Sequence, residues 1–312
     1  MLAIVAPGQG AQTPGFLTPW LEDESLRAQL TALSEVSELD LAHYGTQADA
    51  DTIRDTAIAQ PLLVASALLT ARALLGGDTS PVGLTAGHSV GELAAMAIAG
   101  AISDEDALVL VRERGRAMAE ASAARPTSMT AVVSGDPAEV LAAIEAAGCT
   151  PANNNGTGQI VAAGTVEQLA VLAENPPRRA RLVPLSVAGA FHTVHMQPAV
   201  AHLTKVAAGV ATADPVVPLL TNADGSVVGS GAEALSRMVN QVANPVRWDL
   251  CMATMASMGV TGLLELAPAG TLTKIAQRNL KGIALFNLNS PDQLAEARGF
   301  VTTHAATQPD SE

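Results

Sequence analysis

A serine lies in the pentapeptide Gly87-His88-Ser89-Val90-Gly91, which fits the pattern G-x-S-x-G. This pattern is typical of a nucleophile elbow, a sharp turn between a strand and a helix that pushes the serine hydroxyl outward. An apolar strand-like stretch, 82–86, precedes the motif, and an apolar helical pattern, 92–99, follows it. We interpret Ser89 as a candidate nucleophile, with a purely structural turn as the alternative.

A serine nucleophile needs a base, and histidine is the usual one. The chain has six histidines. His192 and His195 follow a predicted strand that ends near Val187, in a segment that we expect to form a loop at the edge of the sheet. His192 is the stronger candidate and His195 the weaker one, against a default role on the surface or in the core. His88 adjoins the serine, so we expect its side chain to point elsewhere.

A hydrolase triad also needs an acid between the serine and the histidine in chain order. The carboxylates in that interval, such as Asp136 and Glu167, fall in a segment that has the pattern of a separate small unit. None of them follows an obvious strand of the main sheet. The sequence therefore points to a Ser–His dyad whose histidine is oriented by a group other than a carboxylate.

An arginine occupies an apolar helix face in the segment 104–122. At about 100° per residue, Leu110, Val111 and Met118 form a stripe from whose middle Arg114 projects. A buried guanidinium is costly unless an anion pairs with it. Two partners stay open, namely an internal Asp or Glu and the carboxylate of a substrate held by two guanidinium nitrogens.

A glycine-containing loop, Pro7-Gly8-Gln9-Gly10-Ala11-Gln12, follows the first apolar stretch, 2–6. It lacks the Lys-Ser/Thr of a P-loop and the full spacing of a dinucleotide fingerprint, which argues against a nucleotide site. We expect the loop instead to present the backbone N–H of Gln9 to the site around Ser89.

Composition excludes several other classes of function. The 312 residues include 17 Lys+Arg and 30 Asp+Glu, and this net charge of -13 disfavours non-specific binding to nucleic acid or anionic membranes. Two cysteines, Cys149 and Cys251, cannot build a disulfide framework and suit a reducing cytosol. The longest apolar run, 93–102, is shorter than the roughly 18 residues of a membrane span. We expect a soluble cytoplasmic protein.

Strand and helix patterns alternate through the first part of the chain, which predicts a parallel sheet covered on both faces. The order strand, helix, strand, strand, helix, strand then follows, at 130–133, 137–147, 150–153, 159–162, 166–174 and 181–187. This βαββαβ series is typical of a ferredoxin-like unit. We predict a core of 1–126 and 189–306, an inserted small subdomain at 127–188 and a disordered tail at 307–312.

Together these residues resemble the malonyl-CoA:acyl-carrier-protein transacylases, the loading enzymes of bacterial fatty-acid and polyketide synthesis. The resemblance covers nearly the whole chain, and it implies an α/β-hydrolase-like core with an inserted ferredoxin-like subdomain. Its motifs, in order, are Gly8-Gln9-Gly10-Ala11-Gln12, Gln60-Pro61, Gly87 to Glu92, Arg114 with Met118, Gly189-Ala190-Phe191-His192, and Gln241 ahead of Asn244-Pro245-Val246-Arg247-Trp248.

The resemblance implies a ping-pong acyl transfer. Ser89 matches the family's nucleophile, His192 its general base and Arg114 the residue that binds the malonyl carboxylate. Malonyl-CoA would load the serine, and the phosphopantetheine thiol of holo acyl carrier protein would then take the malonyl group. The family needs no metal and no cofactor besides the CoA thioester substrate, and nothing in the sequence demands more than a monomer.

Four further positions match the family. Gln9 and Val90 match the oxyanion-hole positions, which act through backbone N–H groups, and Gln241 matches a glutamine near the catalytic histidine. Phe191 resembles the phenylalanine of malonyl-selective members, whereas methylmalonyl-selective members tend to carry a smaller serine there. We therefore expect the bulk of Phe191 to restrict substituents on the α-carbon of the acyl group.

Two other functions fit part of the pattern. A thioesterase or lipase would use the same elbow, but it predicts an acid before the histidine and no buried arginine. A catalytically silent docking module would not need Ser89, His192, Arg114 and Gln241 together. Because carrier proteins are typically acidic, docking on this acidic chain requires a local basic patch. The candidate cations are Arg112, Arg116, Lys274, Arg278 and Lys281.

Overall fold

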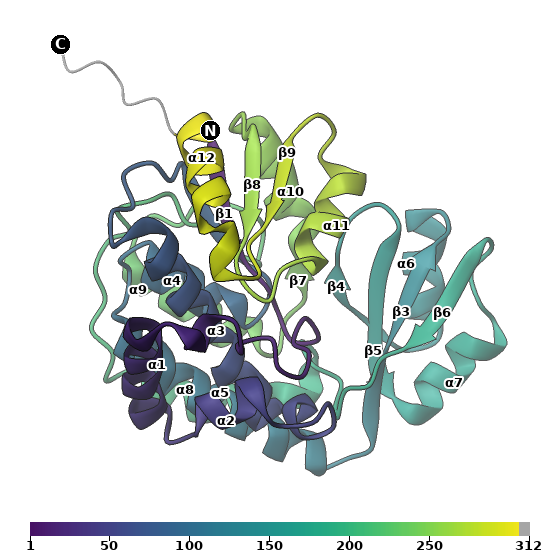
Figure 1. Cartoon of the computed structure of the whole chain (residues 1–312). Helices are drawn as coiled ribbons and strands as arrows, with labels where there is room; N and C mark the ends of the chain where they lie inside the picture. Colours follow the sequence, from purple (N-terminus) through teal and green to yellow (C-terminus); the bar gives the residue numbers. More distant parts are fainter. Residues whose placement is uncertain (306–312) are drawn as a thin grey trace.

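The computed structural model describes residues 1–305, which form two sheets with helices around them (Figure 1). Sheet A is parallel, in the order β2-β1-β8-β9. Its strands are β1 (Leu2–Ala6), β2 (Leu84–Gly87), β8 (Gly262–Glu265) and β9 (Ala284–Asn287). Every residue of β1 is buried, as expected for a strand inside a parallel sheet that helices cover on both faces.

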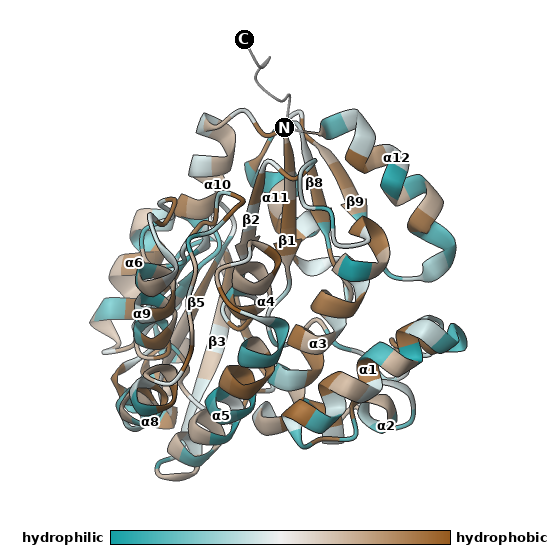
Figure 2. Ribbon diagram, turned by 90° about the vertical axis from the view of Figure 1, so that its left-hand side faces the viewer, coloured by the Kyte–Doolittle hydropathy of each residue, from teal (hydrophilic) through white to brown (hydrophobic). Residues whose placement is uncertain are grey.

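Alternate residues of β1 belong to two different apolar cores, because successive side chains of a strand point to opposite faces. Leu2, Ile4 and Ala6 pack in the larger core, and Ala3 and Val5 in the smaller one. The larger core contains residues of α1 (Glu24–Ser37), α2 (Leu41–Thr46), α3 (Thr56–Leu75), α4 (Gly91–Ile98), α5 (Asp104–Ala123), α8 (Gln197–Ala207), α9 (Gly231–Gln241) and α12 (Leu294–His304). The smaller core contains residues of α10 (Trp248–Ser257) and α11 (Thr271–Asn279). Figure 2 shows β1 coloured as an apolar strand in the middle of sheet A, with helices on either side of the sheet.

Helix α3 is apolar on all sides and long enough, by length and composition, to cross a membrane. Polar residues interrupt its apolar run, so the sequence alone does not indicate this length. In the structure 78% of its most apolar 18-residue window is buried. Its apolar composition is therefore also that of a helix surrounded by protein.

The second sheet, sheet B, has the order β6-β3-β5-β4-β7. Its strands are β3 (Thr127–Ser134), β4 (Thr150–Asn154), β5 (Gln159–Thr165), β6 (Ala180–Pro184) and β7 (Val246–Arg247). The first four pair antiparallel and, with α6 (Pro137–Ala146) and α7 (Val166–Glu174), follow the βαββαβ order that the sequence predicts. They enclose a separate small apolar core, which is consistent with a ferredoxin-like unit.

Strand β7 joins the two parts of the chain. It belongs to the segment that leads into α10, yet it pairs in parallel with β4, with Asn153 opposite Val246. Figure 1 shows sheet B beside sheet A, with β7 and β4 between them. This fifth strand is not predictable from the sequence, because two residues carry no periodic signal. The predicted tail, 307–312, lies outside the described residues.

Candidate active site

The elbow around Ser89 has the expected form, a turn from β2 into α4. The serine has φ of 54°, a left-handed conformation that is strained for a residue with a side chain. A Cβ on Gly87 would lie 1.9 Å from the carbonyl carbon of Gly91, and one on Gly91 would lie 2.3 Å from the oxygen of Ala6. Both glycines are therefore required for the close approach of strand, turn and helix.

Asn222 holds the elbow in place. Its Oδ1 accepts a hydrogen bond of 2.8 Å from the Ser89 N–H, and its Nδ2 donates one of 2.8 Å to the Gly87 oxygen. The side chain thus spans both sides of the turn and is fully buried. These contacts offset part of the conformational strain at Ser89.

His192 lies beside the serine, with Nε2 2.7 Å from Ser89 Oγ. Its Nδ1 lies 2.8 Å from the main-chain oxygen of Gln241. Because a carbonyl oxygen only accepts, Nδ1 must carry the hydrogen, and Nε2 is left to accept from the serine hydroxyl. Burial, and then the positive charge of Arg114, lower the pKa of His192 to about 3. The imidazole is therefore neutral and able to act as a base at pH 7.

The other candidate bases and acids lie elsewhere. His195 is the middle residue of a short helical turn, Val194–Met196, and its side chain makes no hydrogen bond to Ser89 in residues 1–305. Asp136 accepts hydrogen bonds from the first N–H groups of α6, and Glu167 lies exposed on α7. Within residues 1–305 no carboxylate contacts the His192 ring, and the Gln241 carbonyl lies where a triad acid would be.

Arg114 is 1% exposed and lies beside the serine. Its Nη1 donates to Gln60 Oε1 at 2.6 Å, and its Nη2 donates to Gln241 Oε1 at 2.9 Å and to Ser89 Oγ at 3.4 Å. Its Nε is buried and has no partner among the described residues. Burial lowers the pKa of Arg114 to about 10, so the group stays charged at pH 7. The site thus holds a buried cation that no carboxylate of the described residues contacts directly.

Two backbone N–H groups near Ser89 are free. The N–H of Ser89 itself donates to Asn222, but the N–H groups of Gln9 and Val90 take part in no hydrogen bond of residues 1–305. Val90 is the N-cap residue of α4, where the helix dipole favours negative charge. Free N–H groups at a helix start suit a developing oxyanion.

A cavity of about 340 Å³ borders the site and includes Gln9 in its wall. Its other lining residues are Gly10, Gln12, Ala50, Ile53, Arg54, Leu185, Ser186 and Val187. The walls come from the first glycine-containing loop, from the segment 50–54 before α3 and from the segment after β6. Phe191, which is 6% exposed, is buried next to His192 in the chain.

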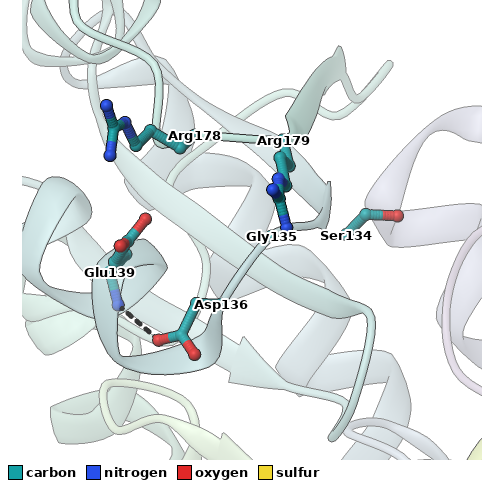
Figure 3. Close-up of a pocket in the computed structure, with 6 residues that line it drawn as sticks. All are labelled: Ser134, Gly135, Asp136, Glu139, Arg178 and Arg179. Atoms are coloured by element: carbon teal, nitrogen blue, oxygen red, sulfur yellow. Dashed lines mark hydrogen bonds between the residues drawn. The ribbon is translucent and has the colours of Figure 1, made fainter.

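A larger cavity, of about 890 Å³, lies between the end of β3, the start of α6 and the segment before β6, and contains none of the predicted site residues (Figure 3). Ser134, Gly135, Asp136, Glu139, Arg178 and Arg179 line it. Figure 3 shows the Asp136 carboxylate turned back to the N–H of Glu139, where it caps α6. Size alone therefore does not locate the active site. Within residues 1–305, no group of His, Cys, Asp and Glu side chains has the arrangement of a metal site.

Comparison with known proteins identifies the family. Residues 4–301 match the acyl transferase domain. The chain is 49% identical to the malonyl CoA-acyl carrier protein transacylase of Mycobacterium tuberculosis, over 95% of this chain and 99% of the relative. The chain belongs to the malonyl CoA-acyl carrier protein transacylase family. This confirms the resemblance drawn from the motifs.

Solved structures of transacylases have the same fold. The crystal structure of MCAT from Mycobacterium tuberculosis has a TM-score of 0.91 and 49% identity, and the match covers 96% of this chain and 99% of that one. A malonyl-transacylase in complex with the holo acyl-carrier protein of a type II polyketide synthase has a TM-score of 0.89 and 28% identity, with 96% and 99% covered. The predicted α/β class is therefore confirmed.

Three polar residues of this transacylase site have no role that the sequence predicts. Gln60 and Glu92 lie within the family motifs, whereas Asn222 lies outside them. Asn222 follows an apolar stretch, 216–220, whose Leu219 and Leu220 pair with Thr85 and Val227. An asparagine at the end of such a stretch was the available signal. Its connection to Ser89, 133 residues earlier, has no local trace.

Proposed function

We propose that this chain transfers the malonyl group from malonyl-CoA to the phosphopantetheine thiol of acyl carrier protein through a malonyl-serine intermediate. One observation carries the proposal: a Ser89–His192 pair at 2.7 Å with the buried, charged Arg114 3.4 Å from the same serine oxygen. A nucleophile beside a fixed cation suits an acyl group that bears its own carboxylate. Membership of the transacylase family supports this substrate.

The first half-reaction loads the serine. His192 Nε2 removes the proton of Ser89 as Oγ attacks the thioester carbonyl, and the N–H groups of Gln9 and Val90 stabilise the oxyanion. The C–S bond then breaks, and His192 returns its proton to the CoA thiolate. Arg114 binds the malonyl carboxylate with its planar fork throughout.

The second half-reaction reverses the proton transfers. The phosphopantetheine thiol gives its proton to His192 and attacks the malonyl ester, and the serine leaves with that proton. The Gln241 carbonyl keeps His192 oriented in both halves by accepting from Nδ1. The site fits a hydrolase less well, because the triad of a hydrolase would place a carboxylate where the Gln241 carbonyl lies.

Acyl carrier protein is the proposed macromolecular partner, as in the related complex with a polyketide carrier. Of the candidate cations, Arg112 and Arg116 are held in ion pairs with Glu38 and Glu113. The other three, Lys274, Arg278 and Lys281, lie exposed in or just after α11 and form no ion pair within residues 1–305. These three are the better candidates for contact with an acidic carrier.

We further propose a cytoplasmic, monomeric enzyme without metal or cofactor, whose catalytic core is 1–126 and 189–306 and whose small subdomain is 127–188. Both cysteines are free and buried, which suits a reducing compartment. The separate apolar core of sheet B supports the division of the chain.

Intact-mass spectrometry tests the proposed function. After mixing with malonyl-CoA, the protein is expected to carry one malonyl group, and adding holo acyl carrier protein is expected to discharge it onto the carrier. Acetyl-CoA serves as the control and is expected to load poorly, because it offers no carboxylate to Arg114. An adduct that discharges to water as fast as to the carrier would favour a hydrolase instead.

Phe191 gives a prediction about acyl selectivity. Its buried ring precedes the base, so the smaller Phe191→Ser side chain is expected to leave room for an α-methyl group. Methylmalonyl loading relative to malonyl should rise by about tenfold, since one methyl in an apolar pocket is worth roughly 1–3 kcal/mol. The ratio is measured by competition between the two CoA esters. An unchanged ratio would show that Phe191 does not set selectivity.

A further inference from the structure

Glu92 is a buried carboxylate that the mechanism above does not use. It is the second residue of α4, just after the elbow, and its side chain is 4% exposed. Its Oε1 accepts from the main-chain N–H of Asn222, and its Oε2 accepts from Nε2 of the Gln241 side chain. A buried carboxylate is costly, so its place between two fixed donors needs an explanation.

The Gln241 amide connects Glu92 to Arg114. Its Nε2 faces three acceptors, which are Glu92, the Ser89 oxygen and Asn222 Oδ1, and its Oε1 accepts from Arg114 Nη2. These partners fix which end of the amide is oxygen and which is nitrogen. The arrangement places a negative and a positive group at opposite ends of one amide dipole, so that each contact strengthens the other.

Glu92 has three hydrogen-bond partners, the Asn222 N–H, the Gln241 amide and the Thr221 hydroxyl, and the first two cannot become acceptors. The Asn222 N–H belongs to the backbone, and the Gln241 amide is held by the Ser89 oxygen and by Arg114. A proton on Glu92 would compete with these hydrogens for the lone pairs of its oxygens and would remove the charge that strengthens both contacts. Both contacts are therefore strongest while Glu92 is ionised.

We propose that Glu92 is a positioning residue for the malonyl carboxylate: as an ionised carboxylate it holds the Gln241 amide, which in turn holds the Arg114 guanidinium in its binding position. The inference rests on the proposed function and deepens it. Malonyl loading then depends on the ionisation of Glu92, whereas the reactivity of the Ser89–His192 pair toward a neutral reagent does not.

The surroundings of Glu92 leave Arg114 as its one charged neighbour in the described chain. Burial raises the pKa of Glu92 to about 7, although Arg114 and the hydrogen bonds oppose this shift. Cys251 on α10 also faces it and stays a neutral thiol, because burial raises its pKa. Helices α3 and α9 contribute the neutral amides of Gln60 and Gln241. His88 and His192, beside the serine, are neutral near pH 7, because burial lowers the pKa of each.

The pH dependence of kcat/KM for malonyl loading of the wild type is the first test. Below a pH of about 7, Glu92 takes up a proton, and loading is expected to fall about tenfold per pH unit. His192 stays neutral in this range, so labelling of Ser89 by a neutral fluorophosphonate is expected to show no such fall. A fall shared by both reagents, or by neither, would overturn the inference.

Glu92→Gln is the second test, because glutamine keeps the size but cannot accept from both donors. We expect kcat/KM for malonyl loading to drop about 10- to 100-fold, mainly through KM, and the pH limb near 7 to disappear. Fluorophosphonate labelling and the melting temperature should change little. Glu113→Gln is the matched control, since Glu113 neighbours Arg114 in the helix but pairs with Arg112 and Arg116.

The outcomes separate this inference from the proposed function. A wild type that accepts no malonyl group at any pH would overturn the proposed function and this inference with it. If the wild type loads malonyl normally and Glu92→Gln loads equally well, only the role of Glu92 is overturned. The same holds if Glu92→Gln loses malonyl loading and fluorophosphonate labelling by the same factor. If Glu92→Gln loses malonyl loading but keeps fluorophosphonate labelling, the proposed function and the role of Glu92 are both supported.

Discussion

The Ser89→Ala variant is expected to carry no malonyl group after mixing with malonyl-CoA, and transfer to acyl carrier protein should fall by on the order of 10⁴-fold or more. The reason is local, because Ser89 Oγ is the atom that His192 Nε2 faces at 2.7 Å. Removing the hydroxyl removes the bond-forming atom, while the elbow keeps its backbone contact to Asn222. Intact-mass spectrometry and a carrier-loading assay measure the two effects.

Ser257→Ala provides the matched control for this experiment. Ser257 is exposed at the end of α10, and its hydroxyl only donates to Thr254 within the same helix. It should load malonyl like the wild type. A malonyl adduct that persisted on Ser89→Ala at the wild-type level would place the nucleophile elsewhere and contradict the proposed dyad.

Helices that begin with a local capping motif have nearly the same bounds in the prediction and in the structure. The predicted helix 166–174 is α7, because Thr165 and Gln168 form a capping box at its start. The predicted helix 104–122 is α5, where the Ser103 side chain caps the N–H of Asp106. Such caps are set within a few residues, so the order of residues alone reveals them.

The predicted strand 181–187 is shorter in the structure, where β6 spans Ala180–Pro184. Its last residues leave the sheet to line the cavity beside Gln9, and Leu185 keeps a single backbone bond to Met129. The apolar pattern continues past the strand because these side chains still pack against protein. Burial and strand pairing give the same sequence pattern, and only the structure separates them.

The candidate site was predictable in its members but not in its contacts. The sequence placed Ser89, His192, Arg114 and Gln241 together through the family resemblance. It did not show that Gln241 uses its main-chain oxygen for His192 and its side chain for Arg114. That division depends on where α9 ends relative to the loop at His192, which is a long-range packing outcome with no local signal.

Arg114→Ala should reverse the preference between malonyl-CoA and acetyl-CoA. The guanidinium is buried, charged and unpaired by any carboxylate, so it supplies a charge-assisted contact that only malonyl can use. Malonyl loading is expected to fall about 10²- to 10³-fold, which corresponds to roughly 3–4 kcal/mol. Acetyl loading should change far less, because Ser89 and His192 keep their contact.

The control for this prediction lies on the same helix. Arg116→Ala also removes a positive charge from α5, but Arg116 is exposed and pairs with Glu38 and Glu113, so its loss should leave both loading rates near the wild type. Loading is followed by rapid quenching and intact mass for each CoA ester. If Arg114→Ala lowered malonyl and acetyl loading by the same factor, the arginine would act on the serine hydroxyl 3.4 Å away rather than on the substrate carboxylate. The ratio of the two rates therefore decides between a substrate-binding role and a role in holding the nucleophile.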